Sequence, residues 1–190
     1  MFSKRALARW GVVVLVFFPL MGLPRSAQPL KMDTIALKVA MIGKIAEFVQ
    51  WPASVGLDDP ARPLEFVILG SSALESRLMD YYRQVRIAGH RVFLRRAHDI
   101  DDIGRPQILF VAPSAEDDIE RITARLNRVP TLIVADSPGF AKRGVAINMF
   151  IDGDQVGFEV SRAALQRHKL QASYHLLNLA RLIETQQARR

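Results

Sequence analysis

The sequence predicts an α/β domain of three layers, in which a mostly parallel sheet is flanked by helices and a C-terminal β-hairpin is followed by two helices. Two observations support this fold class. Short apolar runs such as LEFVILG (64–70) and QILFVAP (107–113) alternate along the chain with segments of helical spacing. These runs are continuously apolar, which is typical of parallel strands that are covered on both faces.

The first predicted helix runs from about residue 35 to residue 50 and can be capped by Asp33 or Thr34. Pro52 ends this helix, because a proline ring disfavours helical geometry for the residue before it. The elements that follow are expected at 64–70 (strand), 72–85 (helix), 90–96 (strand), 107–113 (strand), 114–129 (helix) and 131–137 (strand). The helix at 114–129 is expected to begin with a variant capping box made of Ser114 and Asp117.

The C-terminal part of the chain changes character. Residues 145–152 and 155–160 flank an Asp-Gly pair at Asp152–Gly153, which indicates a β-hairpin. One helix is expected from Ser161. After a break at 169–172, a last helix is expected with Ser173 as its cap. Its inward-facing residues would be Leu176, Leu179, Ala180 and Ile183.

Residues 1–27 are predicted to be a signal peptide, and residues 28–190 a single domain. Lys4, Arg5 and Arg9 form a basic start, and the uncharged run WGVVVLVFFPLMGL (10–23) follows. A run of this length is typical of a signal-peptide core and is short for a bilayer span. We place the cleavage after Ala27, and an uncleaved N-terminal anchor is the alternative. Export of the protein is therefore expected.

The charge balance argues against nucleic acid as a partner. The full chain carries a net charge of +7, but four of its basic residues lie in the first 27 positions. The rest has 22 basic and 19 acidic residues, a net charge of +3, without aromatic residues interleaved among the basic ones. The chain has no cysteine, which excludes disulfides and thiol catalysis.

Five segments in order resemble the YfiR family of bacterial periplasmic proteins. They are KVAMIGKIAEFVQWP (38–52), LEFVILG (64–70), QILFVAP (107–113), TLIVADSPGF (131–140) and GVAINMFIDGDQVGFEVSRAALQRHKLQASYHLLNLARLI (144–183). The similarity extends over about residues 34–184. Its most specific parts are the Trp-Pro end of the first helix and the C-terminal pattern INxxxxxxxVxFEV…L…S…LLxLA.

The resemblance implies a non-enzymatic repressor in the periplasm. Such a protein binds the periplasmic domain of an inner-membrane diguanylate cyclase and is released when an outer-membrane lipoprotein sequesters it. Two departures from the family are visible here. Better-known members carry cysteines, so redox control is not expected in this cysteine-free chain. Lys169 stands where the family often has glycine, so we expect a strained or differently shaped helix end.

No motif predicts an enzyme, a cofactor or a metal site. The four histidines show no metal-ligand spacing, and we interpret them as surface residues. Glu116, Asp117 and Asp118 stand in the first turn of a predicted helix, where acidic residues complement the helix dipole. The chain contains no P-loop, Rossmann or GxSxG pattern.

A ligand crevice is expected where the parallel strands end, because ligands of such sheets favour the carboxyl edge. Small hydroxyl residues there open helices and can offer backbone N–H groups to an anion. The alternative is that Ser72 and Ser114 only cap helices. The candidate crevice residues are Gly70, Ser71, Ser72, Ser114, Asp136, Ser137, Gly139 and Phe140.

The first predicted helix carries two apolar stripes, and one sheet face can bury only one of them. The second stripe consists of Leu37, Met41, Phe48 and Trp51. It requires the C-terminal helices, a second subunit such as that of a homodimer, or a partner protein. In one interpretation Trp51 is a lid on the core. In the other, Trp51 is an exposed anchor for a partner, because Trp is enriched at binding hot spots.

The leading functional interpretation is a periplasmic regulatory protein that binds and represses an inner-membrane signalling enzyme, with a diguanylate cyclase as the first candidate. The alternative is a periplasmic sensor that binds a small molecule in the strand-end crevice. Binding of a nucleic acid or a cofactor is not expected in either case.

Overall fold

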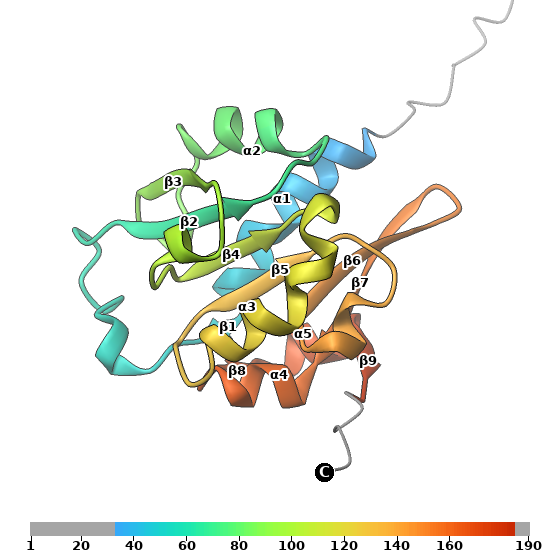
Figure 1. Ribbon diagram of the computed structural model, residues 1–190. Helices are drawn as coiled ribbons and strands as arrows, with labels where there is room; N and C mark the ends of the chain where they lie inside the picture. Colours follow the sequence, from blue (N-terminus) through green and yellow to red (C-terminus); the bar gives the residue numbers. More distant parts are fainter. Residues whose placement is uncertain (1–32, 185–190) are drawn as a thin grey trace, which may run out of the picture. The chain divides into compact units, whose positions relative to one another are not determined.

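The structure is a computed structural model that describes residues 33–184. The predicted signal peptide lies outside the described residues and stays a prediction. Within residues 33–184, no helix is long and apolar enough to cross a membrane. The α-helices of this part are α1 (Thr34–Glu47), α2 (Glu75–Tyr82), α3 (Ile119–Arg125), α4 (Arg162–Arg167) and α5 (Tyr174–Leu179) (Figure 1).

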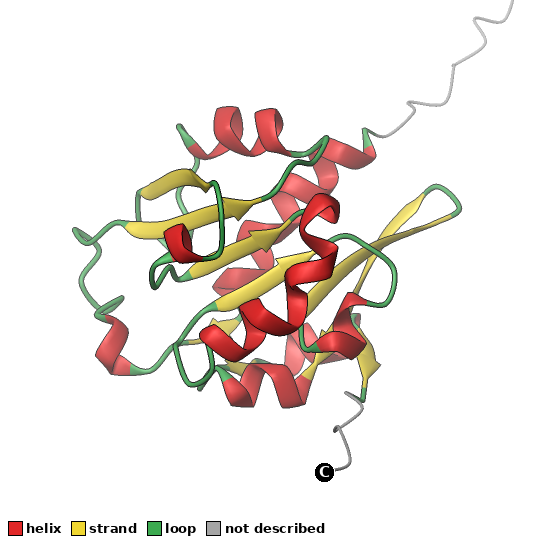
Figure 2. Ribbon diagram, in the orientation of Figure 1, coloured by secondary structure: helices red, strands yellow, loops and turns green. Residues whose placement is uncertain are grey.

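In the described part of the chain, seven strands form one sheet in the order β3-β2-β4-β5-β6-β7-β9 (strands labelled in Figure 1 and coloured yellow in Figure 2). The strands are β2 (Leu64–Leu69), β3 (Val92–Ala97), β4 (Ile108–Val111), β5 (Leu132–Ala135), β6 (Ile147–Asp152), β7 (Gln155–Ser161) and β9 (Arg181–Ile183). Neighbours from β3 to β6 are parallel, whereas β6 and β7 form an antiparallel hairpin. The predicted fold class, a mostly parallel sheet with a C-terminal hairpin, is confirmed.

The sheet buries a core on each face, as continuously apolar strands require. Phe66 and Ile68 of β2 point into the larger core, which α1, α2, α4 and α5 cover. Val67 and Leu69 of the same strand point into the second core, which α3 and short 3₁₀ turns cover. This arrangement is the predicted set of three layers.

Helix α1 begins as expected but ends early. The Asp33 side chain accepts hydrogen bonds from the backbone N–H groups of Ile35 and Ala36. The helix ends at Glu47, and β1 (Val49–Gln50) pairs antiparallel with β8 (Gln171–Ala172). The expectation that the helix continues to Gln50 was therefore wrong. Strand pairing competes with the helix here, and Pro52 favours extended geometry in the residue before it.

The predicted capping box of Ser114 and Asp117 does not form. Residues Pro113–Asp118 make a 3₁₀ helix without a side-chain cap, and α3 starts only at Ile119. The hydroxyl of Ser114 instead accepts a hydrogen bond from the backbone N–H of Ser71 at 2.7 Å. A contact between two strand ends has replaced the local cap.

Helix α4 ends in a Schellman motif that has lysine at the position where glycine is usual. The backbone N–H of Lys169 donates to Gln166 O, and that of Leu170 donates to Leu165 O. Lys169 adopts a φ of 58°, in the left-handed region that glycine enters without cost. The strain expected from this departure from the family is present in the backbone.

The predicted last helix is shorter than expected. Ser173 caps α5 by accepting from Leu176 N–H, but the helix ends at Leu179 and Arg181–Ile183 become β9, parallel to β7. Leu179 is exposed, so its predicted inward position was wrong, whereas Leu176 is buried as predicted. The backbone groups of these last residues therefore find hydrogen-bond partners in β7 instead of within a helix.

Two of the four histidines are buried, contrary to their interpretation as surface residues. Nδ1 of His90 lies 2.9 Å from Arg62 O, and His168 has no solvent exposure. His168 Nδ1 lies 3.0 Å from Leu126 O; since a carbonyl only accepts, this nitrogen carries the proton. Burial lowers the pKa of His168, and its hydrogen bonds to Val129 and Leu126 oppose this only in part. Tertiary packing has made His168 a link between α4 and the chain after α3.

Candidate functional site

An aromatic surface lies where α1 ends and the chain returns through β8. It consists of Phe48, Trp51 and Tyr174, and we refer to it as the aromatic surface. Phe48 is 42% exposed, and Tyr174 is more exposed still. The backbone N–H of Ser173 donates to Phe48 O at 2.9 Å, so Phe48 and Tyr174 flank one backbone contact. Large aromatic side chains left in solvent in this way are typical of protein-binding surfaces.

The four residues of the predicted second stripe occupy different environments. Trp51 and Met41 are half-buried and pack against the larger core, while Leu37 is half-buried nearer the start of α1. Phe48 remains the most exposed of the four. Trp51 follows β1 and lies outside the helix, so its position is set by strand pairing. The structure thus gives Trp51 a core contact and leaves Phe48 to face solvent.

The predicted crevice residues divide between two separate hollows along the carboxyl edge of the sheet. Gly70, Ser71 and Ser114 line the first, which lies where β2 and β4 end. Asp136 and Gly139 line the second, beyond the end of β5. The remaining three candidates line neither hollow: Ser72 caps the turn before α2, Ser137 is buried, and Phe140 belongs to the second core.

We call the first hollow the Ser114 hollow. Polar groups that line it form hydrogen bonds with neighbouring protein groups. It has a volume of about 440 Å³ and lies between β2 and β4, where the order of the parallel strands reverses. Ser114 accepts from Ser71 N–H, and Asp99 accepts from the backbone N–H groups of Asp101 and Asp102. A Cβ on Gly70 would come within 2.7 Å of Ser114 Oγ, which explains glycine at this position.

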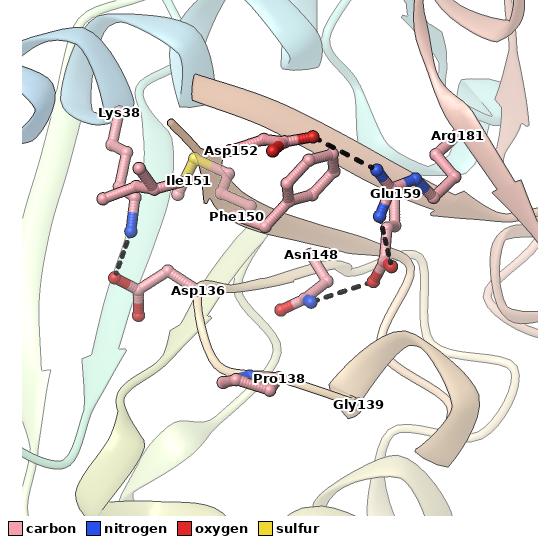
Figure 3. Close-up of a pocket in the computed structure, with 11 residues that line it drawn as sticks. Lys38, Asp136, Pro138, Gly139, Asn148, Phe150, Ile151, Asp152, Glu159 and Arg181 are labelled. Carbon is pink, nitrogen blue, oxygen red and sulfur yellow. Dashed lines mark hydrogen bonds and ion pairs between the residues drawn. The ribbon is translucent and has the colours of Figure 1, made fainter. Parts of the chain in front are cut away.

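The second hollow, which we call the strand-end cavity, has a volume of about 530 Å³. Strand β5 ends at Ala135, opposite Asn148, whereas β6 runs on to Asp152. The space left beside the longer strand is the cavity. Its polar lining comes from five parts of the chain: Lys38 on α1, Asp136 after β5, Asn148 and Asp152 on β6, Glu159 on β7, and Arg181 on β9 (Figure 3).

A buried ion pair forms one side of this cavity. Lys38 Nζ lies 3.1 Å from Asp136 Oδ2, and the two side chains are only 9% and 8% exposed. Asn148 and Glu159 form a cross-strand pair, in which Asn148 Nδ2 donates to Glu159 Oε2 at 3.0 Å. Figure 3 shows the oxygen of the Asn148 amide turned toward Asp136 and its nitrogen toward Glu159. One wall of the cavity is thus polar and consists of these two pairs.

The other side of the cavity is aromatic and more open. The guanidinium carbon of Arg181 lies 4.2 Å from the centre of the Phe150 ring. Arg181 also approaches Glu159 and Asp152, each at 3.9 Å, and its side chain is more than half exposed. These long, solvent-screened ion pairs hold the arginine weakly.

Sequence reasoning missed Lys38, Asn148, Glu159 and Arg181 as members of this site. A signal was present for the strand residues, because Asn148 and Glu159 are polar residues that each stand between two apolar neighbours on a strand. The Lys38 side chain gave no such signal, since lysines on helices usually face solvent. No group of three or more His, Cys, Asp or Glu residues within 33–184 could hold a metal ion.

Comparison with known proteins identifies one family and a broader fold. A family model described as YfiR/HmsC-like matches residues 35–181. None of the curated protein sequences matches the chain. Two solved structures share the fold at 10% identity and a TM-score of 0.54: a conserved domain protein from Vibrio cholerae O1 and an ABC domain from Streptococcus pneumoniae in complex with L-Trp. The chain contributes 78% of its length to each match but spans only 59% and 60% of the two proteins.

Proposed function

The chain belongs to the YfiR/HmsC-like family, and on this premise we propose that it binds an inner-membrane signalling enzyme, a diguanylate cyclase, and holds it inactive. The family points to regulation of cyclic-di-GMP signalling in the periplasm and to a regulatory, non-catalytic role. The predicted signal peptide agrees with that location. In this proposal the cyclase is the partner, and an outer-membrane lipoprotein is the protein that withdraws the repressor.

The observation that best supports a protein partner is the aromatic surface. Within residues 33–184, Phe48 is 42% and Tyr174 is 75% exposed, while Trp51, three residues after Phe48, packs against the larger core. Aromatic residues of this kind bury large apolar area at low entropic cost, which is why they dominate binding hot spots. Repression through this surface requires binding only, which fits a family without catalytic members.

The proposal is tested by deleting the gene and measuring intracellular cyclic-di-GMP. A repressor of a diguanylate cyclase predicts a rise in cyclic-di-GMP in the deletion strain and a return to the original level on complementation. The same deletion in a strain that also lacks the partner cyclase should have no effect. A deletion strain with unchanged or lowered cyclic-di-GMP would contradict the proposed function.

A further inference from the structure

Two buried oxygen atoms in the wall of the strand-end cavity accept no hydrogen bond. They are Oδ1 of Asp136 and Oδ1 of Asn148. The orientation of the Asn148 amide is fixed, because its nitrogen must face the Glu159 carboxylate. A buried acceptor without a donor has lost the hydrogen bond that water would have given it, which is unfavourable. Both unsatisfied atoms are therefore acceptors, and a group that satisfies them has to bring N–H or O–H donors.

The charge of the lining favours a cation as the bearer of those donors. Three carboxylates, those of Asp136, Asp152 and Glu159, face two basic side chains, those of Lys38 and Arg181. The lining therefore carries a formal excess of one negative charge. Lys38 is already occupied by Asp136, so it does not offer an anion an unpaired charge.

Arg181 shows that the outer part of the cavity can hold an organic cation. Its guanidinium lies over Phe150 with one carboxylate, Asp152 or Glu159, on each of two sides (Figure 3). An aromatic ring with flanking carboxylates is a known chemistry for binding cations. Because Arg181 is half exposed and its ion pairs are long, a ligand can displace it at small cost.

From these three observations we infer that the strand-end cavity binds a small organic molecule with a primary ammonium group. The ammonium donates to Asp136 and Asn148, and the apolar part of the ligand lies against Phe150 and Ile151. Both acceptor atoms are shielded from solvent, so side chains of the wall rotate as the ligand enters. A volume of about 530 Å³ suits a free solute of this size. This site is independent of the aromatic surface and of the proposed cyclase.

Calorimetric titration of the purified protein tests the inference with ligands of matched shape. Phenethylamine, butylamine and putrescine supply the ammonium, while phenethyl alcohol and hydrocinnamate replace it by a neutral or an anionic group. We expect at least one amine to bind with a Kd below the millimolar range, and phenethyl alcohol and hydrocinnamate to bind at least tenfold more weakly than that amine. Absence of binding by every amine, or equal binding of hydrocinnamate, would overturn the inference.

Isosteric variants locate the binding. Asp136→Asn and Glu159→Gln each remove one carboxylate from the cavity and are expected to weaken amine binding at least tenfold. Asp118→Asn, in the Ser114 hollow, removes a carboxylate of equal charge and is expected to leave binding unchanged. Circular dichroism checks folding, and Glu159→Gln decides the result if Asp136→Asn fails to fold. Equal weakening by Asp118→Asn, or no weakening by a folded cavity variant, contradicts the site.

Discussion

Helix α1 and its end place two side chains in environments opposite to those that their chemistry favours. Lys38, a cation, is nine-tenths buried against Asp136, while Phe48, an aromatic residue, is left 42% exposed. Burying a charge and exposing a large apolar ring both cost free energy. The buried polar cluster is suited to a small polar ligand, and the exposed aromatic surface to a protein. This difference separates the two regions by the kind of partner that each would bind.

The largest expected effect comes from breaking the buried pair. Asp136→Ala leaves Lys38 buried without its counter-charge, and we expect it to lower the free energy of unfolding by about 3–5 kcal/mol. Urea denaturation measures this change. Lys38→Met combined with Asp136→Leu removes both charges and should recover most of the loss. A loss below about 1 kcal/mol for Asp136→Ala would show that the pair is solvated, and it would contradict the description of Lys38 as a buried cation.

Trp51 tests how far the aromatic surface is also part of the core. The side chain is half-buried against the larger core, so Trp51→Ala should cost about 2 kcal/mol, below the range for fully buried aromatic residues. The same variant should also weaken repression, because Trp51 is one of the three residues of the aromatic surface. Thermal unfolding and intracellular cyclic-di-GMP measure the two effects. An unchanged melting temperature in Trp51→Ala would contradict a contribution of Trp51 to the core.

The sequence predicted the elements whose own residues determine them. The strand at 64–69 is continuously apolar, and the hairpin at 147–161 contains an Asp-Gly turn, so local pattern and final structure agree. Strands β1, β8 and β9 have only two or three residues and exist because a distant partner pairs with them. A local pattern carries no information about such pairings, and for this reason Trp51 and Leu179 were misplaced.

The candidate site was predictable only in outline. The carboxyl edge of the sheet was expected to hold a crevice, and Asp136 and Gly139 do line the strand-end cavity. Lys38 lines the cavity because of where α1 crosses the sheet, and this position is set by tertiary packing. Likewise Arg181 reaches the cavity only because β9 pairs with β7.

His168 also has a buried atom without a hydrogen-bond partner, Nε2. Unlike Asp136 and Asn148, it lines neither the strand-end cavity nor the Ser114 hollow. Its lowered pKa means that the unfolded chain binds a proton more readily than the folded one. Stability from this group is therefore full above the unfolded pKa, about 6.5, and falls as the pH drops below it. We expect the free energy of unfolding to fall as the pH is lowered through the range below that value, because protons then bind the unfolded chain preferentially.

Urea denaturation as a function of pH measures this loss. In His168→Gln the group cannot titrate, so the same pH interval should produce a smaller change. A wild-type stability that rises on acidification from neutral pH would contradict the buried, neutral state of His168.

The central claim is that the aromatic surface carries repression, and Phe48 gives the most direct test of it. Phe48→Ala removes an exposed ring and should change the free energy of unfolding by no more than about 0.5 kcal/mol. Phe93→Ala is the matched control, because Phe93 is 58% exposed on β3, an edge strand of the seven-stranded sheet, whereas the aromatic surface lies beside the separate β1–β8 pair. Each variant is expressed in the deletion strain, and its melting temperature is measured on purified protein.

The measurement that decides is intracellular cyclic-di-GMP in these two strains. The account predicts that Phe48→Ala leaves cyclic-di-GMP near the raised level of the deletion strain, with an almost unchanged melting temperature, and that Phe93→Ala restores the repressed level. Full repression by Phe48→Ala, or an equal loss of repression in Phe93→Ala, would contradict it.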